Sequence, residues 1–269
     1  MPDFLAICEQ AARAGGAVLL EWADRFSVRE KAPSDLVTEA DIASQEVVRS
    51  ILLTAFPDHD FLSEEDPVLP AIAGQARDSA RPAGQLNGRY RWIVDPLDGT
   101  TNYVHHVPEF AVSIALEQAG EVLVGCVFNP VAGECFTAVQ GGGAFLNGRR
   151  LAVSQATELS HALVAASFPP KVEPGSRVLK DFAEVIVACQ SVRRTGSAAL
   201  NLCYVAAGRF DAYWARETKI WDVAAGSLLI REAGGLITGL DGAPFHLDRP
   251  QFISAATEHL HRQLRAIVG

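Results

Sequence analysis

The sequence predicts an α/β protein with two dissimilar halves: an α+β front half and an α/β back half. Up to about residue 150, two helical stretches precede runs of alternating apolar residues joined by tight turns. Beyond that point, short strand-like and helical runs alternate. The chain has 269 residues and 49% hydrophobic side chains, enough for a large core. We therefore expect a single domain over 1–269, with 1–150 and 151–269 as its subregions.

The front half should open with two helices. Residues 3–24 carry apolar side chains three and four positions apart, which is typical of a helix with one buried face. The polar stretch 27–37, which contains a proline, predicts a loop or hairpin. Thr38 and Asp41 have the spacing of a capping box, with Asp in place of the usual Glu, so a second helix should begin there.

Strands should dominate the rest of the front half. Residues 61–65 predict a short strand that ends in two acids. The alternating runs 110–117 and 121–129 predict a hairpin, and 133–145 adds strands around a triglycine turn. Residues 66–90 are rich in Pro, Gly and Ala with little periodicity, and we expect a surface excursion there.

In the back half, strand-like and helical runs follow one another along the chain. Strands are expected at 163–167, 191–194, 210–214, Ile237 and 252–255, and helices at 178–188, 198–207, 221–233 and 257–267. Gly234 and Gly235 should end the third of these helices.

Composition excludes several classes of protein. The net charge is −9 and no basic stripe is present, which argues against a nucleic-acid surface. The five cysteines form no CxxC pair, so we expect buried free thiols in a reducing compartment. No apolar run approaches the roughly 20 residues of a membrane span. The N-terminus has no basic signal-peptide region, so we expect a soluble, cytoplasmic protein without a membrane partner.

The most informative stretch is a short apolar strand, 92–94, that ends in Asp95 and Asp98 and runs into a Gly-Thr-Thr-Asn turn. Carboxylates suit Mg²⁺, and the backbone N–H groups of a glycine-containing turn suit a phosphate oxyanion. Their meeting at one strand end predicts metal-assisted phosphate chemistry. The alternative is a β-turn in which Pro96 and Gly99 only shape the backbone and the aspartates only cap it.

Further acidic residues stand at the edges of predicted elements. They are Asp41, Glu64 with Glu65, and Asp222. Taken singly, Asp41 or Asp222 equally fits a helix-start residue. However, Asp95 and Asp222 have apolar neighbours, where a charge is costly unless it is paired or metal-bound. No comparable number of lysines or arginines flanks these acids, so a divalent metal is the natural counter-charge.

These residues resemble the inositol monophosphatase family of Mg²⁺-dependent, typically lithium-inhibited phosphatases. The stretch Asp95-Pro-Leu-Asp98-Gly-Thr100-Thr-Asn102 matches the family's D-P-x-D-G-T-x-N motif. Trp221-Asp222-Val-Ala-Ala-Gly226, followed by Glu232-Ala-Gly-Gly235, matches its second motif, and Phe61-Leu-Ser-Glu64-Glu65 matches its upstream Glu-Glu pair. The resemblance covers nearly the whole chain and implies a layered αβαβα sandwich of the inositol monophosphatase and fructose bisphosphatase type.

The resemblance also implies a set of metal ligands. Glu64, Asp95 and the backbone carbonyl of Leu97 would bind a first Mg²⁺. Asp95, Asp98 and Asp222 would bind a second, and a third, weaker ion is expected near Glu64. About two or three Mg²⁺ would offset the roughly four negative charges of the ligand carboxylates.

Catalytic and substrate-side roles follow from the same resemblance. Thr100, with Glu64 and Asp41, would position and deprotonate the attacking water. The backbone N–H groups of Gly99 and Thr100 would hold the phosphate. The expected substrate-binding residues are Asp98, Gly99, Thr100, Gly196, Ser197, Ala198 and Asp222. Ser167 also falls where the family has substrate-side groups.

The identity of the substrate is less determined, because Ala215 stands where inositol-preferring members commonly carry a hydroxyl-gripping Glu. Arg216 or Glu217 could take over that role. We expect hydrolysis of inositol monophosphate or a similar polyol phosphate. The alternatives are fructose 1,6-bisphosphate, 3′-phosphoadenosine 5′-phosphate or histidinol phosphate as substrate and, less favoured, a non-catalytic binding protein.

Two further expectations come from the family. One is a homodimer, and the other concerns Lys31, which matches the lysine of the family's mobile front loop. Its spacing to Asp41 is one residue short, which leaves a lid role for Lys31 open.

Overall fold

The structure, a computed structural model, describes residues 3–32, 35–66, 89–169 and 171–269. The surface excursion expected at 66–90 falls almost wholly outside these residues, and so does the side chain of Lys31. The helices are α1 (Phe4–Trp22), α2 (Glu39–Ala55), α3 (Thr100–Val104), α4 (Arg177–Ala188), α5 (Ala198–Ala206), α6 (Ile220–Glu232) and α7 (Glu258–Val268), with a 3₁₀ turn at Leu159–His161.

The strands form a short hairpin and two larger sheets. The hairpin pairs β1 (Val28–Ala32) with β2 (Asp35–Thr38). The seven-stranded large sheet runs, in spatial order, through β3 (Asp60–Ser63), β4 (Tyr90–Asp98), β5 (Ala111–Gln118), β6 (Glu121–Asn129), β7 (Glu134–Val139), β8 (Gly143–Leu146) and β9 (Arg149–Arg150). The five-stranded small sheet has the order β11 (Ser191–Arg193), β10 (Leu163–Ser167), β12 (Ala212–Ala215), β14 (Phe252–Ala255) and β13 (Leu236–Thr238).

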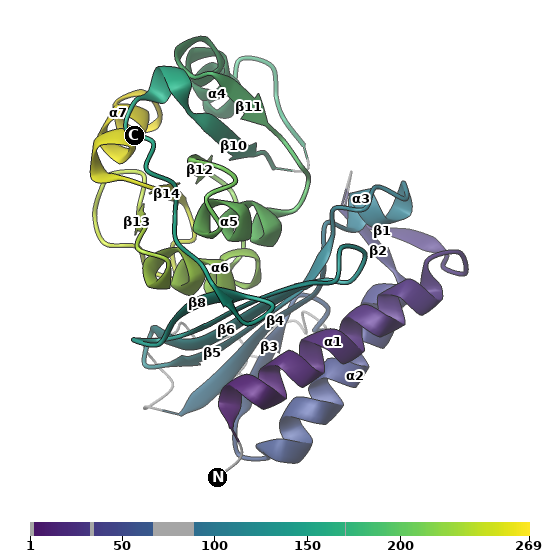
Figure 1. The fold of residues 1–269 in the computed structure, drawn as a ribbon. Coiled ribbons are helices and arrows are strands. Elements are labelled where there is room, and N and C mark those ends of the chain that lie inside the picture. Colours follow the sequence, from purple (N-terminus) through teal and green to yellow (C-terminus); the bar gives the residue numbers. More distant parts are fainter. Residues whose placement is uncertain (1–2, 33–34, 67–88, 170) are drawn as a thin grey trace, which may run out of the picture.

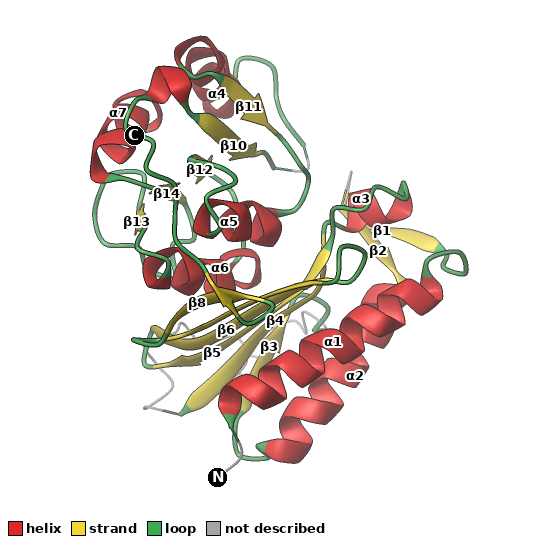
Figure 2. Ribbon diagram, in the orientation of Figure 1, coloured by secondary structure: helices red, strands yellow, loops and turns green. Residues whose placement is uncertain are grey.

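The elements stack in five layers (Figures 1 and 2). Helices α1 and α2 cover one face of the large sheet, α5 and α6 lie between the two sheets, and α4 and α7 cover the outer side of the small sheet. This confirms the expected α/β class and the αβαβα sandwich.

Most expected elements are present, with small shifts at their ends. The stretch 27–37 forms the β1–β2 hairpin, and Thr38 and Asp41 form the predicted capping box at the start of α2. The strand expected at 210–214 lies at Ala212–Ala215 instead. Phe210 belongs to the turn that ends α5, because its N–H donates to the carbonyl of Tyr204 at 3.1 Å.

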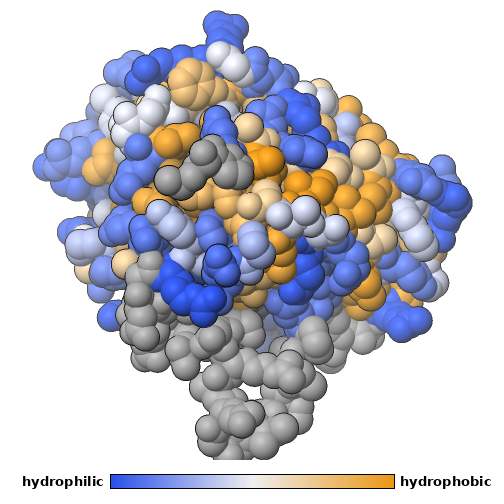
Figure 3. All heavy atoms as spheres, turned by 90° about the horizontal axis from the view of Figure 1, so that it is seen from below, coloured by the Kyte–Doolittle hydropathy of each residue, from blue (hydrophilic) through white to orange (hydrophobic). Residues whose placement is uncertain are grey.

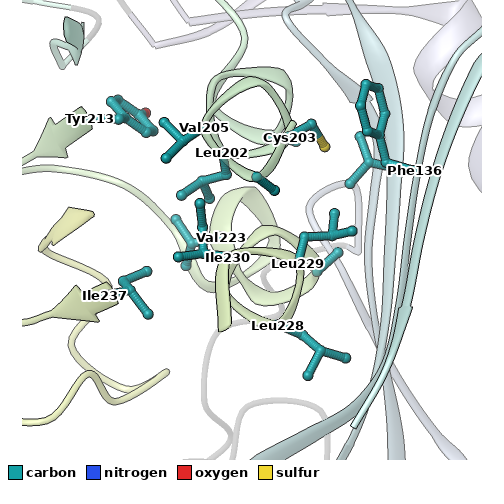
Figure 4. Close-up of a cluster of buried hydrophobic side chains, with 14 of the residues drawn as sticks. Phe136, Leu202, Cys203, Val205, Tyr213, Val223, Leu228, Leu229, Ile230 and Ile237 are labelled. Atoms are coloured by element: carbon teal, nitrogen blue, oxygen red, sulfur yellow. The ribbon is translucent and has the colours of Figure 1, made fainter. Parts of the chain in front are cut away.

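Strand β4 is buried on both faces, which explains its apolar sequence. Ile93 packs into the core around α5 and α6, part of which Figure 4 shows, whereas Trp92 and Val94 pack into the core under α1 and α2. Two cores therefore fix the strand whose end carries Asp95 and Asp98. The five cysteines are free thiols, as predicted, and all but the half-buried Cys189 are buried.

On the surface, apolar residues gather near the centre of the face seen from below, bordered by polar ones (Figure 3). The large hydrophobic side chains that are exposed in the described part of the chain are Leu20, Val28, Ile42, Val107, Val131, Leu179, Ile186 and Val187. None of the described helices combines the length and apolar character that crossing a membrane requires.

Candidate active site

The end of β4 brings Asp95 and Asp98 to the same cavity. Between these two residues the pairing with β5 slips by one position, which is a β-bulge. Pro96 lies in the bulge, where its missing N–H removes no ladder hydrogen bond. The next N–H, of Leu97, donates to Oδ1 of Asp95 at 3.0 Å. Asp95, Leu97 and Asp98 consequently all line one cavity, called here the carboxylate cavity.

The turn after β4 requires a glycine. Gly99 has a φ of +93°, and a Cβ atom there would lie 2.9 Å from the carbonyl oxygen of Glu109. This conformation starts α3 and places Gly99 and Thr100 on the wall of the carboxylate cavity. The Thr100 Oγ1 lies 3.1 Å from the Leu97 carbonyl oxygen and 3.3 Å from Oδ1 of Asp41.

Asp41 combines the two roles that the sequence left open. Its Oδ2 accepts hydrogen bonds from the Thr38 N–H at 2.9 Å and the Thr38 hydroxyl at 2.6 Å, which caps α2. Its Oδ1 is the oxygen that faces Thr100. With only 1% of Asp41 exposed, the carboxyl is held in one orientation by the cap.

Asp222 is held in the same way at the start of α6. Its Oδ2 accepts the N–H of Lys219 at 2.8 Å, three residues earlier. The hydroxyl of Ser113 in β5 donates to the Trp221 carbonyl at 3.4 Å, which ties the start of α6 to the large sheet. Asp222 therefore lines the carboxylate cavity from α6, whereas Asp41 belongs to α2 on the other face of the large sheet.

Glu64 enters the cavity from the turn after β3. Its N–H donates to the carbonyl of Val94 at 3.2 Å, so the turn lies beside β4. Glu64 lines the cavity together with Asp95, Asp98 and Asp222. Four of the sequence-predicted acids thus share one cavity, although three different elements or their turns carry them.

Asp98 is anchored by the N-terminus of α5. Its carboxylate accepts hydrogen bonds from the Ser197 hydroxyl and from the N–H groups of Ala198 at 3.1 Å and Ala199 at 3.0 Å. Ser197 is fully buried, so it contacts Asp98 from behind, whereas Ala198 lines the cavity. The expected substrate-side loop therefore also fixes one acid of the site.

Asn102 is a positioning residue that the sequence did not single out beyond its place in the motif. Its Nδ2 donates to the carbonyl oxygens of Glu109 at 2.7 Å and Thr195 at 2.8 Å. This clamp holds the loop with Gly196, where φ is +96° and a Cβ atom would lie 2.6 Å from the Asn102 amide. A glycine followed by the serine that caps α5 is the sequence signal that could have identified this loop.

The acids raise one another's pKa. Burial raises the pKa of Asp95 well above its usual value, and the charges of Glu64, Asp98 and Asp222 add to it. Burial likewise raises the pKa of Asp222, with Asp98 as the next cause. The pKa of Asp98 is raised to about 6 by burial, although its hydrogen bonds to Ser197 and α5 act in the opposite direction. A cation at the cavity would relieve this repulsion.

The donor set suits a hard divalent cation. Carboxylate oxygens of Glu64, Asp95, Asp98 and Asp222 and the Leu97 carbonyl oxygen are the ligand types that Mg²⁺ prefers. In the part of the chain that the structure describes, no three acidic, imidazole or thiol groups form a closed cluster around one point. The acids border an open cavity instead, and their mutual repulsion is the observation that favours a cation.

The carboxylate cavity measures about 570 Å³, a volume typical of small-molecule sites. Ser167, Phe168, Arg194 and Glu217 also line the cavity. Ala215 is fully buried and adds no polar group to this wall.

Arg216 lines the carboxylate cavity, but its guanidinium is engaged elsewhere. Its guanidinium pairs with the buried Asp181 and donates to the Val268 carbonyl at 2.6 Å. Glu217 is exposed and lines the cavity.

The fold and the site define a class of protein, and comparison with known proteins agrees. The chain belongs to the inositol monophosphatase family, whose model matches residues 3–269. Membership of this family supports a phosphatase, and it confirms the resemblance found in the motifs.

Particular relatives carry two kinds of name. An inositol-1-monophosphatase of Rhizobium meliloti is 41% identical over 245 residues, which cover 90% of this chain and 86% of the relative. A protein of Pseudomonas aeruginosa named Nus factor SuhB is 39% identical over 264 residues, covering 96% and 93%.

Solved structures share the fold. The extragenic suppressor protein suhB from Bartonella henselae superposes with a TM-score of 0.86 at 37% identity, covering 98% of this chain and 97% of that chain. The inositol monophosphatase from Anabaena gives a TM-score of 0.79 at 35% identity, covering 98% and 94%.

Proposed function

We propose that this protein is a Mg²⁺-dependent phosphomonoesterase that hydrolyses inositol 1-phosphate or a similar small polyol phosphate. The observation that carries the proposal is the shared cavity of Glu64, Asp95, Asp98 and Asp222, next to the contact between Thr100 and Asp41. The acids supply hard-cation ligands, and the Thr100 side chain supplies a group that can orient water.

Glu64, Asp95, Asp98, Asp222 and the Leu97 carbonyl would hold about two or three Mg²⁺ in this proposal. When bound, these ions lower the pKa of water and stabilise the charge on the leaving alkoxide. The bulge in β4 and the caps of α5 and α6 keep the acids in place without substrate, so little reorganisation precedes the reaction.

The remaining chemistry is assigned to side chains and backbone of the β4–α3 turn. The Thr100 hydroxyl donates its hydrogen toward Oδ1 of Asp41, which leaves the Thr100 oxygen to accept a hydrogen from the attacking water. Glu64 accepts the second hydrogen of that water. The backbone N–H groups of Gly99 and Thr100 bind a phosphate oxygen, as amides of glycine turns commonly do.

The relatives named inositol-1-monophosphatase favour inositol 1-phosphate as the substrate. Phosphate release should be measured on inositol 1-phosphate, fructose 1,6-bisphosphate, 3′-phosphoadenosine 5′-phosphate and histidinol phosphate. Each substrate would be tested with Mg²⁺, with chelator, and with Mg²⁺ plus lithium. Turnover that requires Mg²⁺, falls with lithium and is greatest on the first substrate would support the proposal. Greater turnover of another member of the panel would make that compound the proposed substrate and leave the proposed mechanism unchanged.

A second function deserves the same test because some relatives are named Nus factor SuhB. In that case the chain would act as a binding partner and not as an enzyme. The presence of Glu64, Asp95, Asp98, Thr100 and Asp222 favours catalysis over this alternative. Folded, Mg²⁺-binding protein with no turnover on the panel would favour the binding role. We propose in addition that the protein is a single domain, is cytoplasmic and forms a homodimer. Light scattering would measure the mass of the particle in solution and so test the homodimer.

A further inference from the structure

The lining of the carboxylate cavity includes a serine at the position next to Ala215. Strands β10 and β12 run parallel, and Ser167 pairs in register with Ala215 at their carboxyl ends. Ser167 is half-buried and lines the carboxylate cavity. A hydroxyl is therefore presented beside the place where a carboxylate at position 215 would project.

The hydroxyl of Ser167 forms a hydrogen bond with the hydroxyl of Tyr213. Their oxygen atoms lie 2.6 Å apart. Tyr213 precedes Ala215 by two residues on β12 and is fully buried; Figure 4 shows its ring extending from the small sheet toward α5, beside Val205. Each hydroxyl can donate or accept, so the Tyr213 phenol can donate a hydrogen bond to the Ser167 oxygen.

A second buried residue backs the phenol. Asn201 of α5 is wholly buried, and its Oδ1 accepts the hydroxyl of Thr195 at 2.8 Å. Among the described residues its amide nitrogen has no hydrogen-bond partner, although the Tyr213 phenol is a neighbour. Thr195, like Ser167, lines the carboxylate cavity.

The direction of the hydrogen bond between Tyr213 and Ser167 decides what the Ser167 hydroxyl can offer to a ligand. When the Tyr213 phenol donates to the Ser167 oxygen, the Ser167 hydrogen is no longer used within this pair and is available to the cavity that Ser167 lines. It can then meet an oxygen of a bound molecule. A buried hydrogen-bonding group of this kind discriminates strongly against ligands that leave it unpaired.

We propose that Tyr213 is a positioning residue for substrate specificity, which orients the Ser167 hydroxyl toward a hydroxyl oxygen of a polyol phosphate. It partly replaces the carboxylate that Ala215 lacks. This inference rests on the proposed phosphatase function and narrows its substrates to phosphate esters with a hydroxyl group near the ester.

The test compares two substrates that differ in hydroxyl groups, inositol 1-phosphate and p-nitrophenyl phosphate. In Tyr213→Phe, which removes one oxygen atom, the ratio of kcat/KM for inositol 1-phosphate to that for p-nitrophenyl phosphate should fall about tenfold. The change should appear in KM for the polyol substrate. Ser167→Ala should lower the ratio by a similar factor, and the double variant by no more than either single one, because both remove the same hydrogen bond.

Tyr103→Phe is the matched control. Tyr103 is also buried, and its hydroxyl donates to the Leu19 carbonyl at 2.7 Å, beneath α1 and outside the carboxylate cavity. It should lose stability as Tyr213→Phe does, which thermal unfolding would measure, without changing the substrate ratio. An unchanged ratio in folded Tyr213→Phe, or additive effects of the two single variants, would overturn the inference. Absence of Mg²⁺-dependent turnover of either substrate by the parent chain would overturn the proposed function and this inference with it.

Discussion

The hydroxyl of Thr100 lies 3.3 Å from Oδ1 of Asp41, although 59 residues separate them in the chain. The other oxygen of the same carboxyl accepts both donors of Thr38 and so caps α2. One carboxyl group therefore serves the helix and faces the site at the same time. The cap removes its rotational freedom, which presents Oδ1 to Thr100 in one orientation.

Replacing this carboxyl should separate the two roles. In Asp41→Asn, the amide nitrogen cannot accept, so either the cap or the contact to Thr100 is lost. We expect kcat to fall about 100-fold, the usual scale for losing a general base system. The free energy of unfolding should fall by about 1 kcal/mol because the cap is weakened. Kinetics with inositol 1-phosphate and urea unfolding would measure the two effects.

Thr38→Val is the matched control for this prediction. It removes the hydroxyl that donates to Oδ2 of Asp41 at 2.6 Å and leaves Oδ1 opposite Thr100. Its stability should fall by a similar amount while kcat changes little. If Thr38→Val lowered kcat as much as Asp41→Asn does, the Thr38 N–H alone would not hold Asp41 in its orientation, and the loss of kcat could not be assigned to the contact with Thr100 alone.

Asp95→Asn should abolish turnover while preserving the fold. Asp95 is 1% exposed, and the neighbouring acids raise its pKa further, so removing its charge relieves repulsion in the metal-free protein. We expect the melting temperature in chelator to rise or stay equal, and the stabilisation by added Mg²⁺ to shrink. Thermal unfolding across a Mg²⁺ titration would measure both. Near-normal activity of this variant would refute the assigned metal ligands.

The parts of the site that lie close together in the sequence were predictable. The capping box of Thr38 and Asp41 spans three residues, and the β4 motif holds Asp95 and Asp98 within one strand, so spacing alone indicates both. The layered fold followed from the family resemblance, and strand and helix periodicity placed most elements within one or two residues.

Contacts between distant segments were not predictable. Asp98 is held by Ser197, 99 residues away, through the N-terminus of α5. Arg216 was one candidate to replace the acid missing at position 215, but its pairing with Asp181 takes it out of that role. Neither contact has a periodic or spacing signature, because tertiary packing between distant segments creates both.

The raised pKa values predict that pH affects the stability of the metal-free and the metal-bound protein differently. The carboxyl of Asp98 has a pKa of about 6 in the folded chain and 3.8 as its ordinary value. Between these values the folded state binds more protons than the unfolded one, so stability is fully present below about pH 4 and falls as pH rises through about 6. For Asp98 alone the loss is at most about 3 kcal/mol. Melting temperatures in chelator should therefore fall between pH 5 and pH 7.

In saturating Mg²⁺ the trend should weaken or reverse. Metal binding requires ionised carboxylates, so the affinity for Mg²⁺ should rise as pH increases through about 6. The difference in melting temperature between Mg²⁺ and chelator would accordingly be larger at pH 7 than at pH 5. An equal difference at both pH values would show that Asp98 and its neighbours do not bind the ion.

Two glycine variants test how the loop before α5 supports the site. Gly196 and Gly120 both have positive φ, +96° and +91°, but a Cβ atom at Gly196 would lie 2.6 Å from the Asn102 amide, whereas one at Gly120 would meet nothing within 4 Å. Gly120→Ala should lose only the strain of an alanine at positive φ, about 1 kcal/mol, and keep full activity. Gly196→Ala has the same strain and also displaces Asn102, which clamps Thr195.

We therefore expect Gly196→Ala to lose about 1 to 3 kcal/mol more stability than Gly120→Ala, as overpacking commonly does. Its kcat should also fall, because the displaced loop releases Asp98 from the N–H groups of Ala198 and Ala199. Urea unfolding and steady-state kinetics of both variants would give the comparison. Equal losses in the two variants would mean that backbone strain alone matters at Gly196, and that the Asn102 clamp does not transmit to the carboxylate cavity.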